Sequence, residues 1–295
     1  MLEEAFLQAI AEHSEDDHYR LVYADWLEEQ GDPRAQLVRI SHGVPRCEAI
    51  ISDIHGNLEA LEAVLRDIAS WNVREIYCLG DMVGYGPNPR ECVDLTRTLK
   101  LTLMGNHDEF AWHDPEGHSP TGDHSLFWIR SQLDQPSEAP EYRQRRWDFI
   151  SGLPRSHTED DFLFVHGSPR NPINEYLFPE DIDNLRKMQR NFEQVRRYCF
   201  HGHTHLPGIL TDWPRQFHRP ADFNSVFHLD QRKALVNVGS VGQPRDGDWR
   251  ACYVLLVGTT VHYRRVEYDV EATIRKIYAI PELENFLGDR LRDGR

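Results

Sequence analysis

Residues 50 to 57 read Ile50-Ile51-Ser52-Asp53-Ile54-His55-Gly56-Asn57, so an aspartate and a histidine follow directly on a short apolar run. A helix-like segment, Leu58 to Trp71, comes next. Open α/β sheets place their functional sites at the carboxyl ends of strands. We therefore expect a buried strand that presents two metal ligands at its end. An Asp-x-His pair is weak evidence by itself, because ordinary turn chemistry produces many such pairs.

Four further motifs repeat this arrangement, each directly after an apolar, strand-like run. They are Gly80-Asp81, Gly105-Asn106-His107-Asp108, Val165-His166-Gly167 and Gly202-His203-Thr204-His205. Two divalent ions about 3.5–4 Å apart need one ligand that spans both, and a carboxylate does this best. Asp81, at the end of the second strand, is the natural bridge between two sets of four ligands. The available ligands are Asp53, His55, Asp81, Asn106, His166, His203 and His205.

The order of these five motifs, across residues 49 to 205, resembles that of the calcineurin-like metallophosphoesterase superfamily. The resemblance implies an α/β fold, a four-layer α/β/β/α sandwich of two mixed sheets. The order of predicted elements agrees with this fold, because strands and helices alternate from residue 47 to 104 as in a parallel half-sheet. Strands then dominate from Tyr198 to about residue 267, and helices are expected at Ile182–Val195, Ala272–Tyr278 and Glu282–Leu291.

The resemblance also implies a role for each motif residue. The first metal would be bound by Asp53, His55 and His205 together with Asp81, and the second by Asn106, His166 and His203, again with Asp81. His107 would assist the leaving group or contact the phosphate, as would Asn106, and Asp108 would orient His107. The cofactors would be two divalent ions, with Mn first and Fe, Zn, Co or Ni as alternatives.

Differences between this sequence and other classes of the superfamily narrow the expected activity. Protein serine/threonine phosphatases and dinucleoside polyphosphate hydrolases of this superfamily carry an arginine after the Gly-Asp, and residues 80 to 87 hold none. Both classes stay as alternatives, as does a metal-bound scaffold without turnover. Gly84-Tyr85-Gly86-Pro87 and the glycine-rich turn at 236–246 resemble the small prokaryotic phosphodiesterase/phosphatase branch. In that turn Arg245 or Asn237 would touch substrate, or the segment is an Asx-type turn with a surface arginine.

The expected reaction is in-line attack of a metal-bridging hydroxide on a small phosphodiester or phosphomonoester, such as a nucleotide. His107 would protonate the departing alkoxide. Tyr85 and Tyr176 would either stack on a base or aryl group of the substrate or pack within the protein.

The bulk composition limits the partners. The net charge of −15 disfavours long nucleic acids, which usually bind a basic face. No run reaches the roughly 20 apolar residues of a membrane-spanning helix, and the acidic first residues do not resemble a secretory signal. The five cysteines form no Cys-x-x-Cys pair, and we expect reduced thiols in a cytoplasmic protein.

Three parts are expected along the chain. Residues 1–42 predict a helical hairpin, whose second helix would end at Gly31-Asp32-Pro33. The hairpin resembles the bacterial repeat-companion domain and would dock on a protein partner or on the following domain. Ser41 to Pro45 is a predicted linker. Residues 46–270 would form the metallophosphoesterase domain, with a helical and loop insertion near 111–156. Residues 271–295 would add helices packed on that domain.

Overall fold

A computed structural model describes residues 2–13, 17–39, 47–113 and 120–295. The chain divides into two compact units, residues 1–47 and residues 48–295. The predicted linker, Ser41 to Pro45, lies outside the described residues. None of the described helices combines the length and the apolar character that a bilayer crossing requires. All five cysteines are free thiols, and four of them are buried.

The first unit contains a third helix beyond the predicted hairpin. Its helices are α1 (Leu2–Glu12), α2 (Asp17–Glu29) and α3 (Arg34–Arg39). The predicted stop at Gly31-Asp32-Pro33 is confirmed, because Gly31 has a φ of 68° and Asp32 Oδ1 accepts a hydrogen bond from the Arg34 N–H at 2.9 Å. A small apolar cluster on Tyr23, Leu27 and Ala35 holds the helices together.

Two mixed sheets build the second unit. In the described chain the first sheet has six strands in the order β3-β2-β1-β11-β12-β9. The strands β1, β2 and β3 are parallel to one another. Strand β12 is antiparallel to both β11 and β9. The bounds are β1 Cys47–Ile51, β2 Glu75–Cys78, β3 Leu101–Thr102, β9 Val226–His228, β11 Ala251–Val257 and β12 Thr260–Val266.

The second sheet also has six strands in the described chain, in the order β4-β5-β6-β10-β7-β8. Its central strands β5, β6 and β10 are parallel, and antiparallel strands β4, β7 and β8 lie at the two edges. The bounds are β4 Ser156–Glu159, β5 Phe162–Val165, β6 Tyr198–His201, β7 Gly208–Asp212, β8 Arg215–His218 and β10 Ala234–Asn237.

The main core lies between the two sheets. It joins Ile50 and Val254 of the first sheet to Phe164, Phe200 and Val236 of the second. Because side chains alternate along a strand, the neighbouring residues of the second sheet point to its other face. There Val165, Cys199 and Leu235 form a second cluster with the helix α9. Strands buried on both faces are typical of sheets covered by helices on the outside.

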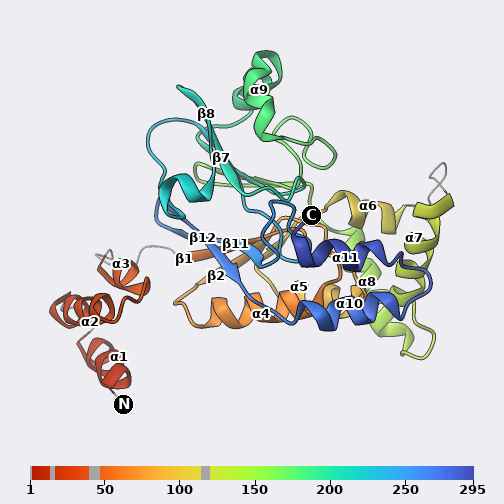
Figure 1. The fold of residues 1–295 in the computed structure, drawn as a ribbon, viewed down its shortest axis with the longest axis horizontal. Coiled ribbons are helices and arrows are strands. Elements are labelled where there is room, and N and C mark those ends of the chain that lie inside the picture. The colour runs from red at the N-terminus through yellow and green to blue at the C-terminus, as the bar shows by residue number, and fades with distance from the viewer. Residues whose placement is uncertain (1, 14–16, 40–46, 114–119) are drawn as a thin grey trace. The chain divides into compact units, whose positions relative to one another are not determined.

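Helices cover both outer faces, and in Figure 1 α9 lies on the opposite side of the sheets from α4 and α10. The α-helices are α4 Leu58–Ala69, α5 Pro89–Thr96, α6 Asn106–Trp112, α7 Pro120–Leu133, α8 Pro140–Ser151, α9 Leu185–Glu193, α10 Val270–Tyr278 and α11 Phe286–Asp293. Two 3₁₀ turns are η1 (Pro179–Asp183) and η2 (Pro220–Phe223). The predicted four-layer sandwich of two mixed sheets is confirmed.

One predicted helix is interrupted in the structure, and the predicted insertion contains helices. The helix expected over Ile182–Val195 is split into η1 and α9, because Asn184 interrupts it and its side chain caps α9 by accepting a hydrogen bond from the Lys187 N–H. The insertion expected near 111–156 contributes α7 and α8, which pack on each other and on α6.

The core between the sheets predicts a clear stability difference. Phe200→Ala removes a fully buried ring from that core, and we expect it to lower the free energy of unfolding by roughly 3–5 kcal/mol. Leu185→Ala, at a side chain that is 60% exposed, should change the free energy by less than about 0.5 kcal/mol. Urea unfolding followed by circular dichroism measures both. Equal effects of the two variants would contradict this placement of the core.

Candidate metal centre

The seven predicted ligands come together, although they come from both sheets. Asp53 and His55 follow β1, Asp81 follows β2, and the remaining ligands follow β3, β5 and β6. These strands are parallel within each sheet, so their carboxyl ends meet at one edge of the sandwich. All seven side chains are buried: Asp53, His55, Asp81, Asn106, His166, His203 and His205.

The first ligand group consists of Asp53, His55 and His205, whose ligand atoms lie within 4.8 Å of one another. His205 Nε2 is 3.2 Å from Asp53 Oδ1 and 3.1 Å from His55 Nε2. Asp53 Oδ1 is buried, and no described group donates a hydrogen bond to it. A buried carboxylate oxygen without a donor is costly, and a cation at this position would satisfy it.

The second group consists of Asp81, His166 and His203, with Asn106 beside them. His166 Nε2 lies 3.1 Å from His203 Nδ1 and 3.1 Å from Asn106 Oδ1. An amide oxygen, two imidazole nitrogens and a carboxylate form a donor set that suits a divalent transition-metal ion.

Asp81 lies between the two groups. Its Oδ2 is 3.6 Å from His55 Nε2 and 3.4 Å from His166 Nε2, and its Oδ1 accepts a hydrogen bond of 2.9 Å from the His107 N–H. One carboxylate oxygen therefore faces an imidazole of each group. This is the position that a ligand shared by two cations would occupy.

Backbone carbonyls fix the tautomers of three of the imidazoles. The Nδ1 atoms of His55, His166 and His205 lie 3.1, 3.0 and 2.5 Å from carbonyl oxygens of Val83, Leu79 and Gln243. If each Nδ1–H donates to its carbonyl, each Nε2 presents a lone pair to the centre. Facing lone pairs on His55 and His205 repel unless a proton or a cation lies between them, so the donor set fits bound metal.

The charges of the site also favour a bound cation. Burial lowers the pKa of His55 well below its ordinary value and lowers that of His203 to about 3. Burial would raise the pKa of Asp81, but the neighbouring His166 and His107 hold it well below its ordinary range. Against the effect of burial, Asp81 in turn raises the pKa of His166 to about 9. The negative charge that holds a proton on His166 would hold a metal cation in its place.

Five of the ligands have left-handed backbone conformations that L-residues rarely adopt. The φ angles are 54° at Asp53, 48° at His55, 53° at Asp81, 68° at His203 and 61° at His205. Each such residue costs of order 1–3 kcal/mol, and such strain clusters at functional sites. The fold therefore holds these ligands in place at an energetic cost.

Two glycines of the motifs are required by close approach of the ligands. A Cβ atom at Gly105 would lie 2.1 Å from Asp81 Oδ1, and one at Gly202 would lie 2.3 Å from Asp53 Oδ2. No other residue fits at these positions without moving a carboxylate. This explains why glycine precedes Asn106 and His203 in the sequence.

His107 lies at the side of the centre. Its ring centroid is 5.0 Å from that of His55 and 4.6 Å from that of Tyr85. Asp108, which we expect to orient His107, accepts hydrogen bonds from backbone N–H groups. Asp108 Oδ2 accepts from the Asp81 and Gly105 N–H groups at 2.8 and 3.1 Å, and Oδ1 accepts from Met82 and Val83 at 3.0 and 3.3 Å. Asp108 thus fixes the loop that carries Asp81.

Arg245 and Asn237, the two substrate-contact candidates, differ in their surroundings. Asn237 is buried and donates to the Gly202 carbonyl and to Thr204 Oγ1, each at 2.8 Å, so it supports the loop of His203. The guanidinium of Arg245 lies 5.8 Å from the Tyr85 ring centroid, and one nitrogen donates to Gln243 Oε1 at 2.8 Å. Arg245 Nε is buried and has no hydrogen-bond partner among the described residues.

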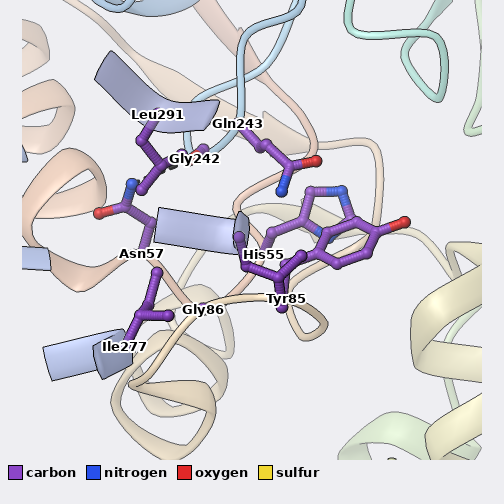
Figure 2. Close-up of a pocket in the computed structure, with 9 residues that line it drawn as sticks. His55, Asn57, Tyr85, Gly86, Gly242, Gln243, Ile277 and Leu291 are labelled. Atoms are coloured by element: carbon purple, nitrogen blue, oxygen red, sulfur yellow. Dashed lines mark hydrogen bonds between the residues drawn. The ribbon is translucent and has the colours of Figure 1, made fainter. Parts of the chain in front are cut away.

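A narrow pocket adjoins the first ligand group. Figure 2 shows His55 and Tyr85 side by side, with Gln243 close to them and Leu291 and Ile277 from the C-terminal helices on the other side. The helices α10 and α11 thus contribute to the wall of the site. The spacing of motifs in the sequence gave no signal for this contribution.

Glu175 fixes the loop after His166. Its carboxylate accepts hydrogen bonds from Ser168 Oγ at 2.6 Å, Arg170 Nε at 2.7 Å and Asn191 Nδ2 at 3.2 Å. Burial would raise the pKa of Glu175, but these hydrogen bonds lower it from 4.5 to about 2. The ionised carboxylate therefore stabilises the folded state.

A pH-dependent effect of Glu175→Gln follows. A depressed pKa contributes stability that is present above about pH 4.5 and is lost as the pH falls toward 2. We expect Glu175→Gln to lower the free energy of unfolding at pH 7 by about 2 kcal/mol, and the difference from wild type to shrink below pH 4.5. Denaturant midpoints of both proteins at pH 7, 5 and 4 test this. A difference that stays constant across this range would contradict it.

The ligand geometry predicts stabilisation by metal. Mn²⁺ at 100 times its dissociation constant should add about 2.7 kcal/mol of stability and raise the melting temperature by roughly 5–10 °C. Asp81→Asn should lose most of this increase, because it weakens both ligand groups. His157→Ala in β4, a control outside the ligand groups, should keep it. Scanning calorimetry with and without Mn²⁺ measures the shift, and an undiminished shift in Asp81→Asn would refute the shared ligand.

Comparison with known proteins agrees with this geometry. Residues 48–260 match the model of the calcineurin-like phosphoesterase superfamily domain. An uncharacterized protein of Methanocaldococcus jannaschii is 36% identical over 263 residues, which cover 84% of this chain and 98% of that protein. A metallophosphoesterase from Sphaerobacter thermophilus is 36% identical with a TM-score of 0.72, over 85% of this chain and 100% of that chain.

A hypothetical protein from Pyrococcus horikoshii OT3 shares the fold, at 20% identity and a TM-score of 0.65, over 84% of this chain and 98% of that chain. The family match and the Asp/His groups together support binding of divalent metal and metal-dependent hydrolysis of phosphoesters. The family model matches most of the second unit of this chain. The chain therefore belongs to the calcineurin-like phosphoesterase superfamily.

Proposed function

We propose that this protein is a binuclear metal-dependent phosphoesterase that hydrolyses a small phosphodiester or phosphomonoester. The observation that carries the proposal is the position of Asp81 Oδ2, 3.6 Å from an imidazole of one ligand group and 3.4 Å from an imidazole of the other. A single carboxylate oxygen between two donor sets is what a pair of cations requires. Mn²⁺ is the cation we propose to test first, because the imidazole-rich set disfavours Mg²⁺ and Ca²⁺.

When bound, the two cations would supply an activated water and positive charge at the phosphoryl group. The residues of the chain hold these parts in position. Asp53 and Asp81 carry the only carboxylates of the ligand groups among the described residues, so two divalent cations leave the centre positive. A phosphoester anion is attracted to it although the chain as a whole is acidic.

His107 is the residue that we propose interacts with the leaving oxygen. Its backbone N–H is held by Asp81 Oδ1, and burial lowers the pKa of its imidazole. A neutral imidazole can donate a hydrogen bond to the oxygen that develops charge as the ester bond breaks. Arg245, beside Tyr85, would contact a further anionic oxygen of the substrate.

The alternative functions differ in the residues that they require at the centre. Residues 80 to 87 supply no arginine next to the centre, which disfavours protein serine/threonine phosphatase and dinucleoside polyphosphate hydrolase activity. A scaffold without turnover would retain the ligands without needing His107 beside them. A hydrolysis assay on variants of Asp81, His166 and His107 distinguishes this alternative from an enzyme.

The proposal predicts metal-dependent hydrolysis of model esters. Protein loaded with Mn²⁺ should hydrolyse bis-p-nitrophenyl phosphate or p-nitrophenyl phosphate, measured by release of p-nitrophenolate. Asp81→Ala and His166→Ala should abolish the activity, and His107→Gln should lower kcat by roughly 10²–10⁴-fold. His157→Ala should retain wild-type activity. If the metal-loaded wild type hydrolyses neither ester nor any of a panel of nucleotides, the proposed function is wrong.

A further inference from the structure

Two exposed aromatic rings extend outward from the second ligand group, and the inner one lies against His203. Tyr176 stacks on His203 with a centroid distance of 3.7 Å and an interplanar angle of 18°. Phe178 is nearly parallel to Tyr176, at 5.5 Å and 10°. The two side chains are 40% and 41% exposed. A stepped aromatic surface therefore extends outward from a ligand of the metal centre.

The backbone that displays these rings is held in place. Leu177 is buried in the apolar cluster beneath α9, and Glu175 accepts hydrogen bonds from Ser168 and Asn191, whereas the two rings are exposed. The Tyr176 carbonyl accepts a hydrogen bond from Lys187 Nζ at 2.7 Å, and the Phe178 N–H donates to Asp181 Oδ2 at 2.8 Å. A pre-organised surface of this kind costs little entropy when a ligand covers it.

A third aromatic ring, that of Tyr85, lies against the first ligand group. Tyr85 itself lies 4.7 Å from His55, centroid to centroid, and so belongs to the other ligand group. Aromatic side chains from two separate loops thus flank the position where a phosphoester would bind.

We propose that Tyr176 and Phe178 form a stacking site for a planar aromatic group of the substrate, a nucleobase or an aryl ester group. This inference rests on the proposed function, because it places the phosphoryl group at the ligand groups and the planar group on the adjacent rings. A base–aromatic stack needs no fixed pattern of hydrogen bonds, since every base presents a π-face. An exposed, parallel ring pair beside the centre provides such a face.

Ligands without phosphate isolate this site from catalysis. Binding of adenosine and of p-nitrophenol to the Mn²⁺-loaded protein is measured by isothermal titration calorimetry, with ribose as the ligand that lacks an aromatic ring. Phe178→Leu removes the outer ring without touching His203. We expect it to weaken binding of the aromatic ligand about tenfold. Phe178→Trp should restore binding, and Phe127→Leu, at a 56% exposed ring on α7, should leave it unchanged.

A kinetic comparison tests the same site during turnover. The ratio of kcat/KM for AMP to that for ribose 5-phosphate should fall about tenfold in Phe178→Leu and stay at the wild-type value in Phe127→Leu. A response to adenosine identifies the nucleobase as the planar group, and a response to p-nitrophenol alone identifies an aryl ester.

Two results would overturn the stacking site. One is that the wild type binds neither aromatic ligand more tightly than ribose. The other is that Phe178→Leu binds them as the wild type does while it retains the melting shift with Mn²⁺. Failure of the proposed function is a separate outcome, because a protein that hydrolyses no ester can still bind adenosine in a manner that depends on Phe178.

Discussion

The carboxylate of Asp81 is the interaction on which the site depends. One oxygen faces imidazoles of both ligand groups, and the other accepts the backbone N–H of His107. The left-handed backbone of Asp81 is in turn held by Asp108, which binds four N–H groups of the surrounding loops. Gly105 leaves the space that this carboxylate occupies. Neighbouring residues thus set the position of the Asp81 carboxylate and leave room for it.

Burial of the core between the two sheets offsets the energetic cost of the metal centre. Five ligands with positive φ, several facing imidazoles and two buried carboxylates all oppose folding. The core between the sheets, built on residues such as Ile50, Phe164 and Phe200, supplies the opposing hydrophobic free energy. Because three parallel strands of each sheet end at the same edge, the site is built from loops that each begin on a rigid strand. Such loops place ligands more precisely than long flexible segments do.

The surroundings of the centre come from parts of the chain far apart in sequence. The loop that follows His166 carries Tyr176 and Phe178 and is fixed by Glu175. The C-terminal helices α10 and α11 pack against Tyr85 from the other direction. These elements do not hold metal ligands, yet they form the walls that a substrate would meet. Differences in substrate preference within a superfamily that shares one set of ligands are expected to arise in such walls.

The sequence by itself indicated the candidate ligands and the fold class, because each motif is local: a short apolar strand followed by a fixed pattern of Gly, Asp, Asn and His. It also indicated that Gly31-Asp32-Pro33 ends a helix, since turn residues act over a few positions. It did not indicate the third N-terminal helix, the break at Asn184, or the use of Asp108 to bind backbone N–H groups. The strained backbone of Asp53 and His55, the meeting of His55 with His205, and the exposure of Tyr176 were decided by the tertiary structure. These features depend on contacts between segments more than 100 residues apart or on burial by distant elements, and no local pattern of residues specifies either.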